Sequence, residues 1–313
     1  QEFEHLELVV NSALSESPTY CLISDGWSNI QKTSIVNSTA FKEERHTAEN
    51  IALGLETTMK DAGINKFGAI ITDNASNMKA AWKILKQKYP KKIFLGCWAH
   101  EGDETFLSTA YFEYQQLKAH VRNNTDLPEN IREEVKKFGT NRWQNFLYNP
   151  VVIVAYKLDL RYCGSRLNAR IFDPIIEKEI LSLVGEEYKD IVLTELAEYV
   201  RKTGSFAHSH LWGDVIQKSV NWWNLMKGRY PILSDIAIQI LFIPATSAAS
   251  ERNWSTFGFI HSKLRNKLHK KRVEKIVYMF WNLRILRSLE KALTIESWVE
   301  KVLQKKAIRE AAK

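Results

Sequence analysis

Residues 67–98 read FGAIITDNASNMKAAWKILKQKYPKKIFLGCW and contain the pattern that decides the fold class. Two short apolar runs, 67–72 and 93–98, flank one amphipathic segment. Strands that alternate with helices are typical of α/β proteins with a parallel sheet. We therefore predict a strand, a helix and a second strand here, with Asn74 or Ser76 as the N-cap of the helix.

Upstream of this stretch the same alternation continues. Residues 20–24 form a predicted buried strand that ends at Asp25, and residues 33–37 form a shorter extended piece. A helix is predicted from its N-cap, Thr47, to Lys60. The N-terminal third of the chain thus reads as an α/β domain.

Downstream of residue 100 the apolar residues follow a helical period. Asn, Pro and Gly interrupt the segments, and Pro244 ends one of them. The predicted helices cover residues 105–120, 128–138, 174–187, 188–202, 232–243, a segment beginning near Ser247 or Ser250, and 271–289.

Composition excludes several classes of protein. The chain has 313 residues, of which 45% are hydrophobic and 26% charged, so it can bury a substantial core. Its net charge of +8 favours a polyanionic partner. Three widely spaced cysteines exclude a disulfide-stapled scaffold and favour a reducing, intracellular setting. Because no apolar run approaches the roughly 20 residues of a membrane-spanning helix, no membrane association is expected.

Three carboxylates have settings that suit metal-dependent chemistry. Asp25 and Asp73 each follow a predicted buried strand, and the carboxyl ends of strands are where sites form in open α/β sheets. Glu251 lies in the predicted first turn of a helix, next to small residues and Arg252. Carboxylates from such positions form an all-oxygen site suited to Mg²⁺ or Mn²⁺. The alternative is that each is a turn, cap or helix-terminus residue, which is the commoner role for a single strand-end aspartate.

Other motifs have both a functional and a structural interpretation. Cys97-x-x-His100 has no second ligand pair of comparable spacing, which argues against structural zinc. Residues 261–272 contain six Lys or Arg, and form either a phosphate-binding patch or a solvated face. The pairs Trp222–Trp223 and Phe280–Trp281 are interpreted as core or subunit-contact anchors rather than base-stacking platforms.

Several blocks, taken in order, resemble transposases of the hAT superfamily. They are CLISDGWSN (21–29), HTAENI (46–51), IITDNASNM (70–78), GCWAH (96–100), the weaker NPVVIVAYKLDLRY (149–162), Trp222–Trp223, YPIL (230–233), IPATSAASERNWS (243–255) and RNKL (265–268). The resemblance covers most of residues 19–288.

The resemblance implies a fold and a domain organisation. The fold is α/β, a ribonuclease H-like core with a mixed sheet, plus a largely helical insertion and C-terminal helices. Residues 1–100 become the first part of the core, 101–205 a remnant of the insertion, and 206–313 the C-terminal part of the core with the hAT dimerisation region.

The resemblance also implies a function, namely metal-dependent cleavage and transfer of DNA strands at transposon ends in the nucleus. Asp25, Asp73 and Glu251 become the catalytic triad that binds Mg²⁺ or Mn²⁺. The helices around Trp222 and Phe280 become the association surface of a homo-oligomer. The residues expected to contact DNA, from the resemblance or from the basic segment, are His100, Arg252, Lys263, Arg265 and Lys267.

This sequence departs from the family pattern in two places. The chain runs almost directly from Asn37 to a polar segment after Phe41, which predicts that a strand is missing, and the helical insertion is shortened. Arg142–Trp143 is either the DNA-contacting pair of the insertion or an unrelated one. Two alternatives stay open. These departures favour a domesticated, inactive relative that dimerises and binds DNA or protein, and the carboxylate chemistry would also suit an unrelated basic α/β nuclease.

Overall fold

The computed structural model divides the chain into two compact units, Gln1–Pro18 with Glu251–Lys313, and Thr19–Ser250. The described residues are 2–16, 20–23, 26–28, 34–36, 39–40, 47–61, 63–97, 106–208, 212, 219–246, 272, 275–280, 282–283 and 287.

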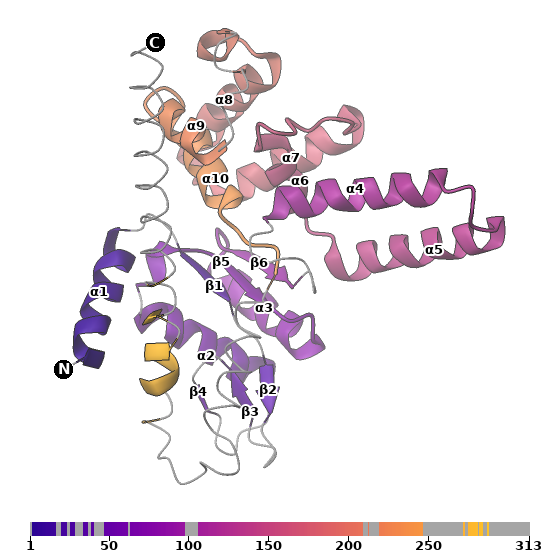
Figure 1. Ribbon diagram of the computed structural model, residues 1–313. Coiled ribbons are helices and arrows are strands. Elements are labelled where there is room, and N and C mark those ends of the chain that lie inside the picture. Colours follow the sequence, from indigo (N-terminus) through magenta and orange to yellow (C-terminus); the bar gives the residue numbers. More distant parts are fainter. Residues whose placement is uncertain are drawn as a thin grey trace, which may run out of the picture. The chain divides into compact units, whose positions relative to one another are not determined.

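A parallel sheet of three strands lies at the centre of the larger unit (Figure 1). Its order is β1 (Tyr20–Ile23), β5 (Phe67–Thr72) and β6 (Ile93–Gly96). Every residue of β5 is buried, as expected for the middle strand of a sheet covered on both faces. The strands predicted over 67–72 and 93–98 are confirmed as β5 and β6.

A second, antiparallel sheet follows β1 in the chain. It consists of β2 (Gly26–Ser28), β3 (Ser34–Val36) and β4 (Thr39–Ala40). The prediction of a missing strand is therefore wrong: the strand is present but only two residues long. So short a strand carries no detectable alternation of polar and apolar residues.

The side chains of Ala69, Ile70 and Ile71 in β5 alternate between two hydrophobic cores. Ile70 belongs to a core built with α2 (Ala48–Asp61) and α3 (Ser76–Lys88). Ala69 and Ile71 belong to a second core, built with the helices that follow β6. The period of two along the strand thus places helical layers on both faces of the sheet.

The layer of α2 and α3 is stabilised at its ends. The hydroxyl of Thr47 accepts a hydrogen bond from the Asn50 N–H (3.3 Å), which confirms the predicted cap of α2. Gly63, with φ of +92°, follows the helix and takes a backbone conformation that favours glycine. The buried carboxylate of Glu56 binds Lys88 Nζ at 2.7 Å and so links the two helices.

Helices make up most of the remaining larger unit. A π-helical turn over Trp143–Leu147 extends α5. The helices are α4 (Leu107–Asn123), α5 (Glu129–Arg142), α6 (Pro150–Leu158), α7 (Ala169–Leu183), α8 (Lys189–Arg201), α9 (Ser219–Met226) and α10 (Pro231–Leu241). Short 3₁₀ turns cover Ile64–Lys66, Glu186–Tyr188 and Gly204–Ala207.

Helix α6 is the centre of this helical layer and packs against α4, α7 and α10. All of its residues except Pro150 and Lys157 are buried. Asn149 caps it by accepting a hydrogen bond from the Val151 N–H, and the Asn149 amide also donates to the Phe94 carbonyl of β6 (3.1 Å). The helical layer is thereby attached directly to the sheet.

A buried carboxylate joins three elements of the same layer. Asp159, directly after α6, accepts hydrogen bonds from Ser108 Oγ of α4 (2.7 Å) and Ser219 Oγ of α9 (2.8 Å). Arg161 Nη2 forms an ion pair with Asp159 at 2.6 Å. We call Asp159, Arg161, Ser108 and Ser219 the Asp159 cluster.

The smaller unit contains α1 (Glu2–Glu16) and helical residues near the C-terminal end of the chain. The rings of Phe3 and Tyr278 lie 5.3 Å apart, and Lys275 Nζ lies 4.5 Å from the centre of the Phe3 ring. All described residues within the predicted helix 271–289 are helical. The predicted helix start at Ser247 or Ser250 lies outside the described residues.

The described part of the chain is thus mostly helical, and its larger unit contains two small sheets. None of the helices in it is both long enough and apolar enough to cross a membrane.

Candidate carboxylate site at the sheet edge

Asp73 follows β5 at the carboxyl edge of the parallel sheet and is partly exposed. Its Oδ1 accepts a hydrogen bond from the Ala75 N–H at 2.9 Å. Its Oδ2 makes no hydrogen bond to the described part of the chain. Within the described residues, one oxygen therefore fixes the carboxylate while the other has no hydrogen-bond donor.

The predicted helix cap is wrong. Ala75, not Asn74 or Ser76, precedes α3, and no side chain caps the helix. Asn74 instead donates from Nδ2 to the Cys97 carbonyl at 3.0 Å, across the end of the neighbouring strand. A tertiary hydrogen bond therefore replaces the local cap.

Two further residues hold the loop of residues 73–75 between β5 and α3, which we call the Asp73 loop. Thr72 Oγ1 donates to the backbone carbonyl of Asp73 (2.8 Å) and accepts a hydrogen bond from Trp82 Nε1 of α3 (3.2 Å). The buried threonine thus connects the loop to the following helix. Sequence reasoning missed Trp82 because a tryptophan on an amphipathic helix indicates packing, not hydrogen bonding to a strand end.

Gly96 gives Asn74 the space it occupies. A Cβ atom at Gly96 would overlap the side-chain amide of Asn74. A glycine at a strand end is a recognised sign of close approach, and it is the one signal in the sequence that points to this contact.

We expect Gly96→Ala to displace the Asn74 side chain and break its hydrogen bond to Cys97. The loss of that bond should lower the free energy of unfolding by about 1 kcal/mol, measured by denaturant titration. The control is Gly139→Ala in α5, where a Cβ atom meets nothing within 4 Å. That variant should be about 0.5–1 kcal/mol more stable, since alanine replaces glycine inside a helix. Equal stability of the two variants would show that the Asn74 contact is unimportant.

The other predicted site residues are not placed. Asp25, His100, Glu251, Arg252, Lys263, Arg265 and Lys267 lie outside the described residues. No three His, Cys, Asp or Glu side chains in the described ranges are arranged to hold one metal ion. Asp73 fits such an ion as a single ligand, because it offers a carboxylate oxygen at a partly exposed position.

Two of the three cysteines do not suit nucleophilic chemistry. Burial raises the pKa of the Cys21 thiol to about 12, and burial also raises the pKa of Cys163. Both are therefore protonated at neutral pH, and the thiolate is the reactive form. Cys97 is buried.

Three of the aromatic side chains considered as contact residues are packing residues, namely Trp143, Trp222 and Trp223. Trp222 and Trp223 are buried in the core, which confirms the core interpretation over base stacking. Trp143 is also buried, and its ring stacks on Tyr114 at 4.0 Å, whereas Arg142 is exposed. Phe280 is about half exposed, at 48%.

Comparison with known families gives one match. Residues 203–283 match the model of the hAT family C-terminal dimerisation region. No curated protein matches the chain. This match over residues 203–283 supports membership of the hAT family and suggests a transposase-related protein, and the matched dimerisation region suggests homo-oligomerisation.

Proposed function

We propose that this chain is a hAT-like transposase core that cleaves and transfers DNA strands with a metal-dependent triad of Asp25, Asp73 and Glu251. The observation that carries the proposal is the position of Asp73 at the carboxyl edge of the parallel sheet, with one carboxylate oxygen fixed and the other without a hydrogen-bond donor among the described residues. The hAT match over residues 203–283 supplies the family context.

The strand register supports pairing of the two aspartates. Ile23 of β1 lies beside Ile71 of β5 in a parallel pair. Asp25 and Asp73 each follow two residues later in the sequence. Adjacent parallel strands end at the same edge of a sheet, so this register favours a shared site.

The order of the strands along the chain also supports a ribonuclease H-like core. The antiparallel strands β2, β3 and β4 come directly after β1, and β5 and β6 add parallel strands after an intervening helix. The described strands form two separate sheets, one parallel and one antiparallel, and not the single mixed sheet that the resemblance implies. The proposal is supported by the order of the strands along the chain and by the helical layers on both faces of the parallel sheet.

The three carboxylates would hold Mg²⁺ or Mn²⁺. Bound there, such ions would supply Lewis-acid activation of water or a 3′ hydroxyl and charge stabilisation for a displacement at phosphorus. The Ala75 N–H orients the Asp73 carboxylate, and the Thr72–Trp82 and Asn74–Cys97 hydrogen bonds keep its loop in place.

DNA is the substrate that the charge favours. The net charge of +8 and the basic segment 261–272 provide cations for phosphate groups, among them Lys263, Arg265 and Lys267. His100 and Arg252 are the further residues that we propose lie near the DNA.

The proposal predicts Mn²⁺-dependent nicking of supercoiled plasmid by the full chain. Asp73→Asn should reduce the rate at least about 100-fold, because a bound metal supplies several kcal/mol of transition-state stabilisation. Asp126→Asn, which alters an acid in the loop between α4 and α5, should leave the rate unchanged. Nicking by Asp73→Asn at the wild-type rate would refute the assignment.

A non-catalytic dimerisation module is the second candidate, and it is favoured by one observation: the family match covers the dimerisation region alone. Calorimetric titration of the chain with Mn²⁺, beside Asp25→Asn, separates the two. Binding that is lost in the variant supports the catalytic core. A wild-type chain that oligomerises but neither binds Mn²⁺ nor nicks DNA supports the module.

A further inference from the structure

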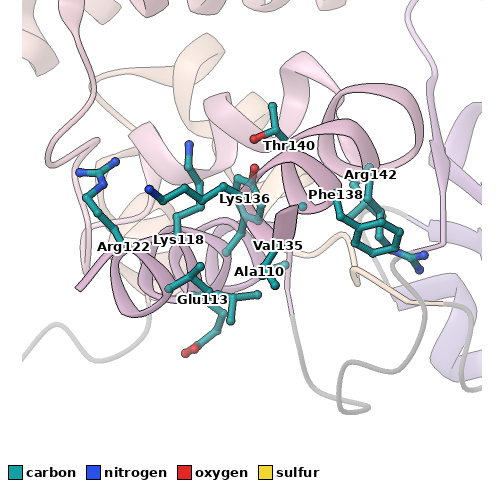
Figure 2. Close-up of a pocket in the computed structure, with 14 residues that line it drawn as sticks. Ala110, Glu113, Lys118, Arg122, Val135, Lys136, Phe138, Thr140 and Arg142 are labelled. Atoms are coloured by element: carbon teal, nitrogen blue, oxygen red, sulfur yellow. The ribbon is translucent and has the colours of Figure 1, made fainter. Parts of the chain in front are cut away.

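A groove of about 680 Å³ lies between α4 and α5, which run side by side as a helical hairpin (Figures 1 and 2). The function proposed above does not use this groove. Apolar residues line much of it, including Leu117 and Val121 of α4 and Val135 and Phe138 of α5.

The apolar lining is uncovered in the described part of the chain. Helix α5 has no buried residue, although Ile131, Val135 and Phe138 follow a helical spacing along one side. Phe138 is 68% exposed and Leu117, on the facing helix, 60%. Exposed apolar side chains gathered along one groove are a feature of interaction sites.

The groove carries an excess of positive charge. Lys118, Arg122, Lys136 and Arg142 line it, against a single acid, Glu113. Lys136 forms an ion pair with Glu133. Within the described ranges, neither Arg122 nor Arg142 forms an ion pair.

The two arginines lie at opposite ends of the groove. Arg122 lies near the end of α4, beside the connecting loop, and Arg142 lies at the end of α5, where the hairpin opens. Figure 2 shows Arg122 with Lys118 and Lys136 toward one end, and Arg142 beside Phe138 at the other. Positive charge thus flanks an apolar centre.

We propose that this groove binds an acidic amphipathic helix of a partner protein. The apolar side of that helix would cover Leu117, Val135 and Phe138, and its Asp or Glu residues would pair with Arg122 and Arg142. Helix α5 is 14 residues long, about 21 Å, which matches a partner helix of about four turns. Seating an amphipathic helix in an apolar groove is a recurring mode of recognition.

Nucleic acid fits this groove less well. A phosphate backbone would pair with the arginines but would leave Leu117 and Phe138 uncovered, and burial of apolar area is the main favourable term in most association. The combination of apolar centre and cationic ends therefore favours a protein segment.

The test is selection of a displayed library of peptides of about 16 residues, four helical turns, on the full chain. We expect enriched peptides to carry apolar residues at helical spacing with Asp or Glu beside them. Phe138→Asp should weaken their binding at least about tenfold, and Arg122→Glu with Arg142→Glu should weaken it and reduce its salt dependence. Leu53→Asp on α2, at a position 63% exposed, is the matched control and should bind as wild type.

Other outcomes would overturn the proposal. If the same peptides were enriched on the wild type and on Phe138→Asp, the groove would not be their binding site. If the enriched peptides carried no excess of Asp or Glu, the groove would not recognise acidic helices. A short DNA duplex that bound Phe138→Asp as well as the wild type, but did not bind the double arginine variant, would show that the arginines bind nucleic acid instead of an acidic helix. Unchanged thermal midpoints of the surface variants would exclude unfolding as the cause of weaker peptide binding. Asp73→Asn should bind the peptides as wild type does, which separates this groove from the nicking activity.

Discussion

Replacing Asp159 with alanine is expected to lower the free energy of unfolding by about 3 kcal/mol. The carboxylate is 2% exposed and holds α4, α9 and the segment after α6 together through Ser108, Ser219 and Arg161. Its loss leaves two buried hydroxyls without their acceptor and Arg161 without its counter-ion. Denaturant titration followed by circular dichroism measures the effect.

An exposed ion pair provides the control. Asp235 binds Lys227 Nζ at 2.6 Å, but its side chain is 59% exposed. Asp235→Ala should therefore cost less than about 1 kcal/mol, as solvent screens such pairs. A similar loss in both variants would mean that the Asp159 cluster contributes no more than a surface pair.

The same cluster predicts a pH dependence. Burial raises the pKa of Asp159, but the hydrogen bonds from Arg161 and the two serines outweigh burial and leave the pKa below its usual range. A carboxyl whose pKa is lowered by folding stabilises the protein above its unfolded pKa of about 3.9, and this contribution is lost as the pH falls through the folded value. Asp159→Ala should therefore lose less stability than wild type on acidification below about pH 4.

Local patterns predicted the elements around the candidate site. Residues 67–72 form β5 with the predicted bounds, and Thr47 caps α2 as predicted. In both cases neighbours in the sequence decide the structure: an apolar run bounded by polar residues, and a hydroxyl three residues before the N–H that it binds.

The sequence did not indicate α6 as a helix. Residues 151–154 read VVIV, a β-branched run with strand propensity, and burial on all sides removes the amphipathic period. Tertiary packing overrides this propensity, since α4, α7 and α10 surround the segment. Asn149 and Pro150, an N-cap followed by proline, were the only local signals of a helix start.

Contacts between distant residues explain two further features that the sequence did not predict. The Asn74 side chain turns away from α3 because the Cys97 carbonyl, 23 residues later, accepts its hydrogen bond. The helices α4 and α5 were predicted as amphipathic, but their pattern does not say which apolar residues stay uncovered. The packing of α4 against α5 in the structure is what leaves Leu117 and Phe138 exposed and buries Trp143.

Trp223→Ala is expected to cost about 3–5 kcal/mol, the range for truncating a fully buried aromatic side chain. Its indole ring has no exposed surface, packs against Trp222 and Tyr199, and donates from Nε1 to the Leu158 carbonyl at 2.9 Å. A cost of this size should lower the thermal midpoint of the larger unit by about 10 °C. Leu225→Ala, on the same helix at a position 69% exposed, should change it by less than about 2 °C.

This comparison also separates folding from association. Both residues lie within the segment that matches the hAT dimerisation region. If Trp223 anchored a subunit contact, Trp223→Ala would dissociate oligomers in sedimentation experiments while the monomer kept its thermal midpoint. Because the ring is buried within one chain, we expect Trp223→Ala to lower the thermal midpoint at every protein concentration. Any dissociation of oligomers would then be a consequence of unfolding. A subunit contact on this part of the larger unit would then use exposed side chains such as Leu225, so that oligomers lost in Leu225→Ala at an unchanged midpoint would identify the association surface.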